Sequence, residues 1–250
     1  MEQLQQYILI TGATSGIGRH IAVNLSKRFA LILNGRNLET LSDTYDLCSK
    51  EKNHLRWIFD LSNVQDVEVE IQSFIAHNKI SIVGFVHCAG FLKMVPLKSI
   101  SFSDLKLTMN INFAVVVLLI KSMISKKVNA AGLKNVVFIS STASIRGAKA
   151  FNVYSASKGA LDALMRSLAV ELAPKVRLNS VLPGGIHTKM TENIFEDKIL
   201  VDRMAKDYPL GLGEPADIYE MVEFLISEKS KWITGQQFVV DGGRTINISA

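Results

Sequence analysis

The sequence is poor in the residues that build disulfide frameworks and metal centres. It holds only 2 cysteines and 5 histidines among 250 residues. Cys48 and Cys88 show no Cys-x-x-Cys spacing, and the histidines are scattered. We therefore expect neither a disulfide framework nor a metal site. Cys88 ends an apolar run, where a thiol usually serves as a small apolar filler.

Long apolar runs are also missing. The longest, residues 113–120, has eight residues and ends before Lys121, whereas a membrane-spanning helix needs about 20. The first six residues are polar apart from Met1 and Leu4, so no signal peptide is visible. We expect no membrane span and a cytoplasmic location.

Charge is not concentrated in any segment. The formal net charge is +5 and the isoelectric point is near 9.1, but the basic residues are dispersed among acidic ones. No basic arm or zinc pattern indicates nucleic-acid binding. A mildly basic surface suits a phosphate-bearing cofactor or an acidic partner.

Short apolar strands alternate with helical stretches along the chain, which predicts one α/β domain over residues 1–250. Short buried strands, each followed by a helix, give a doubly wound parallel sheet of about seven strands with helices on both faces. The candidate strands are 8–11, 30–34, 55–59, 82–88, 135–140, 176–182 and 237–240.

Polar and glycine-containing segments follow the ends of these strands. In such a sheet the strand ends share one edge, where the ligand crevice forms. These segments contain a glycine-rich turn, Arg36, Asp60, Gly90, Ser141 and Pro183.

Residues 11–18 read Thr-Gly-Ala-Thr-Ser-Gly-Ile-Gly between an apolar strand and a helical stretch. This layout aims backbone N–H groups and a helix N-terminus at a diphosphate. The spacing is Gly-x-x-x-Gly-x-Gly, which differs from the common Gly-x-Gly-x-x-Gly. The alternative is a tight turn that only needs positive φ.

Tyr154 and Lys158 are four residues apart, and Ser141 lies thirteen residues before the tyrosine. Residues at i and i+4 share a helix face, so the Lys158 ammonium is expected to lower the pKa of Tyr154 and make it a usable proton donor. The alternative is a core tyrosine beside a solvated lysine.

Together these motifs resemble the classical short-chain dehydrogenases/reductases over essentially the whole chain. Asn112 matches the family's catalytic asparagine, and residues 233–236 and 240–243 match its usual ending. The resemblance implies a Rossmann-type fold and a catalytic set of Asn112, Ser141, Tyr154 and Lys158. It implies cofactor contacts at Gly12, Thr14, Ser15, Gly16, Ile17, Gly18, Arg36, Asp60, Leu61, Ala89, Gly90, Tyr154, Lys158, Pro183, Gly184, Ile186 and Thr188.

Two segments receive their expected roles from the resemblance. Asn112 lies in a long helical stretch, about 102–127, where a kink would let its backbone hold a water near Lys158; the alternative is an asparagine bonding locally. Residues 188–208 resemble the mobile flap that closes over substrate.

One motif departs from the family. His87-Cys88-Ala89-Gly90 replaces the usual Asn-Asn-Ala-Gly after the fourth strand, which puts a polar bond between strands in doubt. His87 can replace that bond or be an ordinary core histidine.

The second strand favours NADP(H) over NAD(H). Gly35 occupies the position where NAD enzymes place an acidic residue, and Arg36 resembles the family's partner for the 2′-phosphate. The alternative is a surface arginine after a turn.

The layout is closest to 3-oxoacyl-acyl-carrier-protein reductases, so we expect NADPH-dependent reduction of a ketone carried as a thioester. Lys175, Lys126 and Lys127 fall near where such enzymes dock their acidic carrier. A sugar, polyol or other secondary-alcohol dehydrogenase is the main alternative, and a non-catalytic NADP-binding scaffold is a remote one. A mean hydropathy of +0.22 and the family's subunit contacts predict a homotetramer.

Overall fold

The computed structural model describes residues 4–247, and its centre is a seven-stranded sheet in the order β3-β2-β1-β4-β5-β6-β7. Every pairing is parallel. The strands are β1 (Gln5–Thr11), β2 (Leu31–Gly35), β3 (Leu55–Ile58), β4 (Ile80–His87), β5 (Asn135–Ile139), β6 (Arg177–Pro183) and β7 (Gln237–Val240). The winding direction reverses between β1 and β4, where the crevice of such a sheet forms. The predicted fold class is confirmed.

The first strand is longer than the sequence pattern indicated. β1 begins at Gln5 instead of residue 8, because Gln5 and Gln6 pair with Ile80 and Ser81 of β4. The two glutamine side chains are exposed and carry no apolar signal. Backbone pairing, and not side-chain burial, extends this strand.

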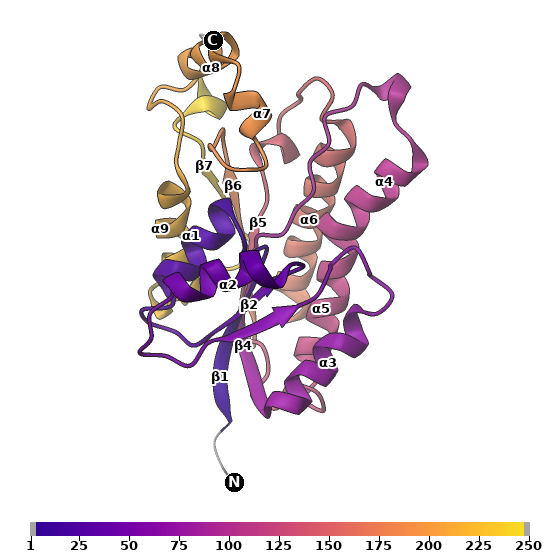
Figure 1. Ribbon diagram of the computed structural model, residues 1–250, viewed down its shortest axis with the longest axis vertical. Coiled ribbons are helices and arrows are strands. Elements are labelled where there is room, and N and C mark those ends of the chain that lie inside the picture. The colour runs from indigo at the N-terminus through magenta and orange to yellow at the C-terminus, as the bar shows by residue number, and fades with distance from the viewer. Residues whose placement is uncertain (1–3, 248–250) are drawn as a thin grey trace.

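Helices cover both faces of the sheet (Figure 1). One face carries α1 (Gly16–Leu25), α2 (Leu38–Leu47) and α9 (Pro215–Ile226), and the other carries α3 (Val67–Asn78), α5 (Val115–Ile124) and α6 (Asn152–Glu171). Alternate residues of β5 join the two cores, with Val136 and Phe138 in one and Val137 and Ile139 in the other. The remaining helices are α4 (Phe102–Met109), α7 (Glu192–Phe195) and α8 (Lys198–Lys206).

A continuous helical run from Phe102 to Ile124 joins α4, the π-helix η2 (Asn110–Ala114) and α5. The run of 23 residues is long and apolar enough to cross a membrane, by length and composition only. Val115, Val116 and Leu119 nevertheless pack in the core against the sheet. A helix that packs in a protein core passes the same test, so the run alone does not indicate a membrane span.

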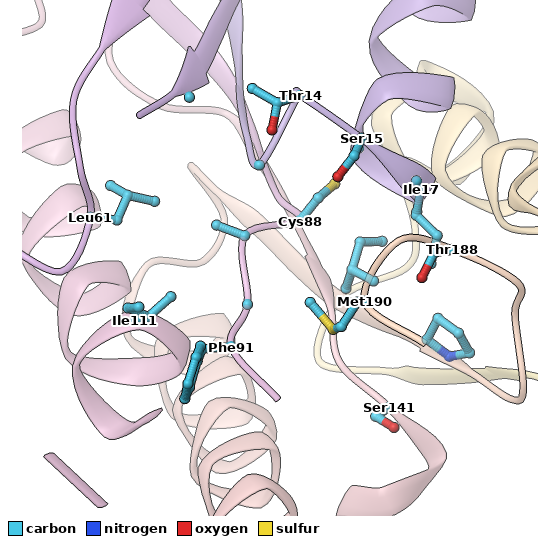
Figure 2. Close-up of a pocket in the computed structure, with 18 of the residues that line it drawn as sticks. Thr14, Ser15, Ile17, Leu61, Cys88, Phe91, Ile111, Ser141, Thr188 and Met190 are labelled. Carbon is cyan, nitrogen blue, oxygen red and sulfur yellow. The ribbon is translucent and has the colours of Figure 1, made fainter. Parts of the chain in front are cut away.

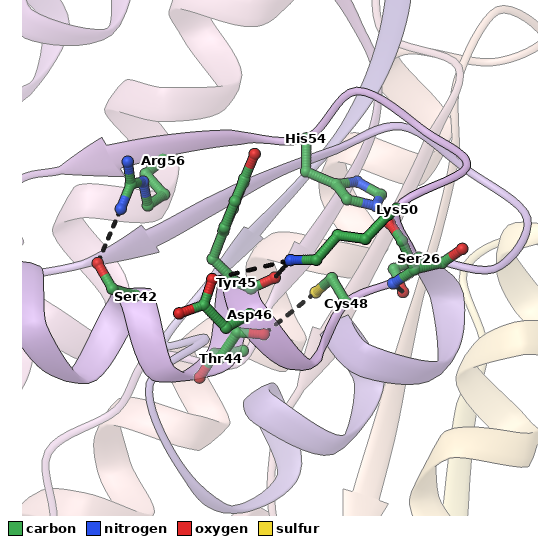
Figure 3. Close-up of polar contacts among 10 residues, drawn as sticks. Ser26, Ser42, Thr44, Tyr45, Asp46, Cys48, Lys50, His54 and Arg56 are labelled. Carbon is green, nitrogen blue, oxygen red and sulfur yellow. Dashed lines mark hydrogen bonds and ion pairs between the residues drawn. The ribbon is translucent and has the colours of Figure 1, made fainter.

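The sheet edge at β3 is tied to α2 by polar contacts (Figure 3). The ring of Tyr45 lies between two cations, with Arg56 Cζ 4.9 Å and Lys50 Nζ 5.0 Å from its centroid. Arg56 also donates to Ser42 Oγ at 2.8 Å. Cation–π contacts at exposed sites contribute about 0.5–1 kcal/mol each. They stabilise α2 and therefore the loop at the end of β2.

Candidate active site

The turn between β1 and α1 lets the backbone approach a ligand closely. Gly12 has φ of +66°, and a Cβ at this position would lie 2.7 Å from the Ala89 nitrogen. A Cβ at Gly18 would overlap the Gly12 carbonyl oxygen. α1 begins at Gly16 without a side-chain cap from Ser15, so its first N–H groups are open to an anion. This geometry fits the diphosphate of a dinucleotide cofactor.

A cavity of about 350 Å³ opens beside this turn at the carboxyl ends of the strands. Thr14 and Ser141 lie toward opposite ends of it (Figure 2). All the residues expected to contact the cofactor line this cavity: Gly12, Thr14, Ser15, Gly16, Ile17, Gly18, Arg36, Asp60, Leu61, Ala89, Gly90, Tyr154, Lys158, Pro183, Gly184, Ile186 and Thr188.

The first turns of α6 present Tyr154 and Lys158 to the same cavity. Both side chains are nearly covered, with 9% and 3% of their residues' surface exposed. Lys158 Nζ lies 5.8 Å from the centroid of the Tyr154 ring and donates to the Ile139 carbonyl oxygen at 2.8 Å. The i, i+4 spacing therefore places the phenol and the ammonium together, as the sequence predicted.

Burial sets the protonation of both groups. It raises the pKa of Tyr154 to about 12, against the opposing effect of a hydrogen bond with Ser141. It lowers the pKa of Lys158 to about 8, which Asp162 and Cys88 oppose. The expectation that Lys158 lowers the pKa of Tyr154 is wrong for the protein without cofactor. Desolvation of the phenol outweighs its hydrogen bond with Ser141, and the Lys158 ammonium is directed at a backbone carbonyl instead.

Ser141 follows β5 and begins the 3-10 helix η3 (Thr142–Ser144). Its Oγ accepts a hydrogen bond from the Ala143 N–H at 3.1 Å. A hydroxyl that accepts from the backbone keeps its own proton to donate. Ser141 is thus able to donate toward an oxygen that gains negative charge.

Asn112 does not line the cavity but supports it from behind. It is fully buried in the π-helix η2. Its Oδ1 accepts from the Phe91 N–H at 2.7 Å, and its Nδ2 donates to the Phe91 carbonyl at 3.0 Å and to Ser157 Oγ at 2.9 Å. The side chain ties the loop after β4 to α6. The predicted kink takes the form of a π-helix, which is common at functional sites.

The unusual His87-Cys88 pair has two different roles. His87 Nδ1 lies 2.9 Å from Thr11 Oγ1, so it links β4 to β1 in place of the family's asparagine. Burial lowers the pKa of His87 to about 3, which keeps the ring neutral. Cys88 is half-buried: it packs against the core beneath α1, as expected of a small apolar filler, and it also lines the cavity. Burial still raises its pKa to about 12.

At the end of β2, Arg36 provides a positive charge, and the Gly35 position, where an acidic residue would stand, is crowded by Thr14. A Cβ added at Gly35 would overlap the Thr14 side chain. Arg36 is exposed at the cavity wall, and its side chain makes no hydrogen bond or ion pair within residues 4–247. Asn37 Oδ1 caps α2 by accepting from the Thr40 N–H at 3.0 Å.

Several cavity residues were not predicted as cofactor contacts. They are Asn34, Gly35, Phe59, Cys88, Phe91, Ile111, Ile139, Ser140, Met190 and Thr191. Most adjoin a predicted residue at a strand end, which is the only signal that could have found them. Tyr208 was also missed, although its hydroxyl accepts from the Gly185 N–H at 2.8 Å and supports the loop after β6. Within the described residues, no three His, Cys, Asp or Glu side chains gather to hold a metal.

Comparison with known proteins agrees with this geometry. The sequence model of the family described as Enoyl-(Acyl carrier protein) reductase matches residues 12–245. Carbonyl reductase family member 4 of Danio rerio is 33% identical over 244 residues, which cover 96% of this chain and 98% of the relative. The 3-oxoacyl-[acyl-carrier-protein] reductase of Mus musculus is 31% identical over 243 residues, 96% of this chain and 98% of the relative.

A solved structure shares the whole fold. The 4-hydroxyisoleucine dehydrogenase mutant complexed with NADH and succinate matches with a TM-score of 0.88 and 29% identity, over 96% of this chain and 99% of that one. The family model, the two relatives and this structure cover nearly the full length. The chain therefore belongs to the short-chain dehydrogenase/reductase family and is an NAD(P)-dependent oxidoreductase.

Proposed function

We propose that this enzyme reduces a ketone to a secondary alcohol with NADPH and that Tyr154 donates the proton. The observation that carries the proposal is that Ser141, Tyr154 and Lys158 line the same cavity as the glycine turn. A carbonyl held against the two hydroxyls would therefore adjoin the cofactor. α7 and α8 occupy most of the proposed flap, about 188–208, within one domain.

The bound nicotinamide supplies the hydride, so the protein has to supply position and a proton. Tyr154 gives its phenolic proton to the carbonyl oxygen as that oxygen gains charge. Ser141 donates a hydrogen bond to the same oxygen. Lys158 holds the ribose hydroxyls and stabilises the phenolate that remains. Asn112 positions the loop after β4, and its backbone is the proposed site of a water near Lys158.

The proposed preference for NADPH rests on Arg36. A guanidinium forms forked hydrogen bonds with a phosphate, and Gly35 leaves no acidic group to bind a 2′-hydroxyl. Arg36 lies at the cavity wall with its side chain uncommitted within the described chain. The solved 4-hydroxyisoleucine dehydrogenase carries NADH, so family membership alone does not choose between the two cofactors.

The proposed substrate is a 3-oxoacyl thioester. The similarity to the mouse 3-oxoacyl-[acyl-carrier-protein] reductase over 98% of its length supports this substrate class. The similarity to 4-hydroxyisoleucine dehydrogenase favours the second candidate, oxidation or formation of another secondary alcohol. A non-catalytic scaffold would have no need to place two hydroxyls and an ammonium in one cavity, as this chain does with Ser141, Tyr154 and Lys158.

The lysines expected to dock an acyl carrier are at the wrong edge of the protomer. Lys126 and Lys127 follow α5, and Lys175 precedes β6. They therefore lie toward the amino ends of the strands, whereas the cavity opens at the carboxyl ends. Within one protomer a carrier bound to these lysines would not face the cavity. The proposal of a thioester substrate does not depend on them.

We further propose a cytoplasmic homotetramer. Both cysteines are free, as is usual in a reducing compartment. We propose that α5 and α6 form one contact between subunits and that β7 forms another. Exposed apolar residues on or near these elements include Phe102 on α4, Val170 on α6 and Val239 on β7. Such residues are expected where helices and an edge strand are covered by another subunit.

The test is a panel of ketones and 3-oxoacyl thioesters with NADPH, and of sugars, polyols and hydroxy acids with NADP⁺, in which turnover is measured as the change in NADPH absorbance. We expect consumption of NADPH with a 3-oxoacyl thioester in the wild-type enzyme and none in Tyr154→Phe, which is the matched control. Turnover of only polyols or hydroxy acids would favour the second candidate. NADPH binding without turnover of any compound would contradict the proposed activity.

A further inference from the structure

Helix α6 carries a buried acid one turn beyond Lys158. Asp162 is 2% exposed, and the four-residue spacing places Tyr154, Lys158 and Asp162 along one face of the helix. Asp162 Oδ2 accepts hydrogen bonds from Ser140 Oγ and from Gln237 Nε2, both at 2.9 Å. Its Oδ1 has no hydrogen-bond partner among the described residues.

Asp162 acts only as a hydrogen-bond acceptor in these contacts. It accepts both of its hydrogen bonds through one oxygen and donates none. A buried charge is costly unless an opposite charge compensates it. Lys158 is the buried cation on the same helix face, and Asp162 raises its pKa against the effect of burial.

The other titratable groups near Lys158 are neutral near pH 7. Burial sets the pKa of His87, at the end of β4, to about 3. It sets the pKa of Cys88 and of Tyr154 to about 12. Asp162 is therefore the one carboxylate among the groups that shift the pKa of Lys158.

Asp162 is also linked to the catalytic serine. Ser140 donates a hydrogen bond to Asp162, and it directly precedes Ser141 at the end of β5. On the other side, Arg166 on α6 donates to Gln237 Oε1 at 3.2 Å, which turns the Gln237 amide nitrogen toward Asp162. The carboxylate thus connects β5 and β7 to the helix that bears Tyr154 and Lys158.

We propose that Asp162 is a positioning residue of this active site. It accepts a hydrogen bond from Ser140, which fixes Ser140 and with it Ser141 against α6, and it is the buried counter-charge on the helix face that bears Lys158. The kinetic part of this proposal rests on the proposed role of Lys158 in catalysis. The electrostatic part concerns the folded chain alone, and is testable without any substrate.

Asp162→Asn separates charge from hydrogen bonding. The amide oxygen can take the place of Oδ2 and keep both hydrogen bonds, while the amide nitrogen takes the place of the unpartnered Oδ1. Ser140→Ala is the matched control, because it removes one hydrogen bond and keeps the charge. A purely structural role for Asp162 would make the two variants alike.

The stability readout follows from the pKa of Lys158. In the folded chain that pKa is about 8, below the ordinary value of 10.5, so the unfolded chain binds more protons between these values and stability rises with pH there. Without Asp162 the pKa of Lys158 falls further, so the rise in stability with pH begins at a lower pH. Asp162→Asn should have a lower Tm than the wild type, and we expect this difference to narrow as pH rises from about 6.5 to about 9. The difference in Tm between Ser140→Ala and the wild type should not change with pH.

The kinetic readout is the pH profile of kcat/KM for reduction. Raising the pH removes the proton from Lys158, so the alkaline limb should move to lower pH in Asp162→Asn by on the order of one unit. Ser140→Ala should lower kcat and leave the limb in place. The proposal would be overturned if Asp162→Asn and the wild type had the same alkaline limb and if their difference in Tm did not change with pH.

A double variant keeps the test decisive if a single variant folds poorly. Lys158→Met alone leaves the Asp162 carboxylate buried without its counter-charge. Adding Asp162→Asn to Lys158→Met should then raise Tm, because it removes that uncompensated charge. Additive losses of Tm in the double variant would overturn the proposed charge pairing, whether or not a substrate has been found.

Discussion

Among the catalytic residues, Tyr154 is kept protonated by its burial. A phenol with a pKa of about 12 releases its proton only to a strong base, such as the oxygen of a ketone that has accepted hydride. We expect Tyr154→Phe to abolish turnover while NADPH still binds, because the ring remains and only the hydroxyl is lost. Steady-state kcat and a fluorescence titration with NADPH measure the two effects. Retention of more than about a tenth of the wild-type kcat would exclude this role for Tyr154.

Arg36 is the residue that would choose the cofactor. One charge-assisted contact with the 2′-phosphate should favour NADPH over NADH by about 10-fold, which is about 1.4 kcal/mol. Arg36→Glu should reverse part of that preference, because a carboxylate would face the phosphate. The measurement is kcat/KM with each cofactor.

The control for Arg36 is Lys52→Glu, since Lys52 is exposed and lies outside the cavity lining. The control makes the same change of charge and should leave the ratio between the cofactors unaltered. Equal kcat/KM for NADPH and NADH in the wild type would reject the assignment of Arg36.

At the scale of elements, the turn from β1 into α1 has the least room for change. A Cβ at Gly18 would overlap a backbone oxygen that cannot rotate away. We expect Gly18→Ala to weaken NADPH binding by about 10-fold or more, since displacing the turn misplaces N–H groups worth about 1.5–3 kcal/mol for each bond to a charged group. Fluorescence titration measures binding, and thermal unfolding reports the accompanying loss of stability.

Gly147→Ala is the matched control for this turn, because a Cβ at Gly147 meets nothing within 4 Å. It should bind NADPH as the wild type does. Wild-type binding by Gly18→Ala would show that the turn adjusts easily and does not cradle the diphosphate.

Elements differed in how far their sequence predicted them. Buried strands such as β5, which is apolar after Asn135, were placed within a residue or so. The polar start of β1 at Gln5 was missed, because its evidence is a pairing with Ile80 of β4. The interruption at Asn112 was predicted from the family, but its form as a π-helix was not, nor were the three hydrogen bonds of its side chain to Phe91 and Ser157.

At the scale of the whole molecule, parallel winding is what made the site predictable. Segments that follow strand ends meet at one edge whatever their distance in sequence, so the cofactor residues could be collected from motifs alone. Contacts that depend on the depth of burial could not be predicted. The raised pKa of Tyr154, the exposure of Cys88 and the bonds from Asp162 to Ser140 and Gln237 all depend on which atoms cover a side chain.

The surface of the protomer bears on its assembly. The apolar stretch 114–120 is only partly buried within the protomer. Val115, Val116, Leu119 and Ile120 are buried, while the three others are half-buried. On α6 the outward positions include small residues such as Ala156 and Ala163, followed by Val170, which is 82% exposed. Small side chains on an outer helix face permit close packing against another helix.

The prediction for the whole molecule is a homotetramer of four 27.6 kDa chains. One contact would pair the α5 and α6 faces of two protomers, and a second would join their β7 edges; two twofold contacts generate D₂ symmetry. Burial of Val170 and of the exposed apolar residues on β7 gives the driving force. Light scattering at micromolar concentration should give the tetramer mass, and Val170→Glu should reduce it to a dimer held by β7. A fully active monomer would rule out both contacts, and a wild-type dimer would leave only one of them.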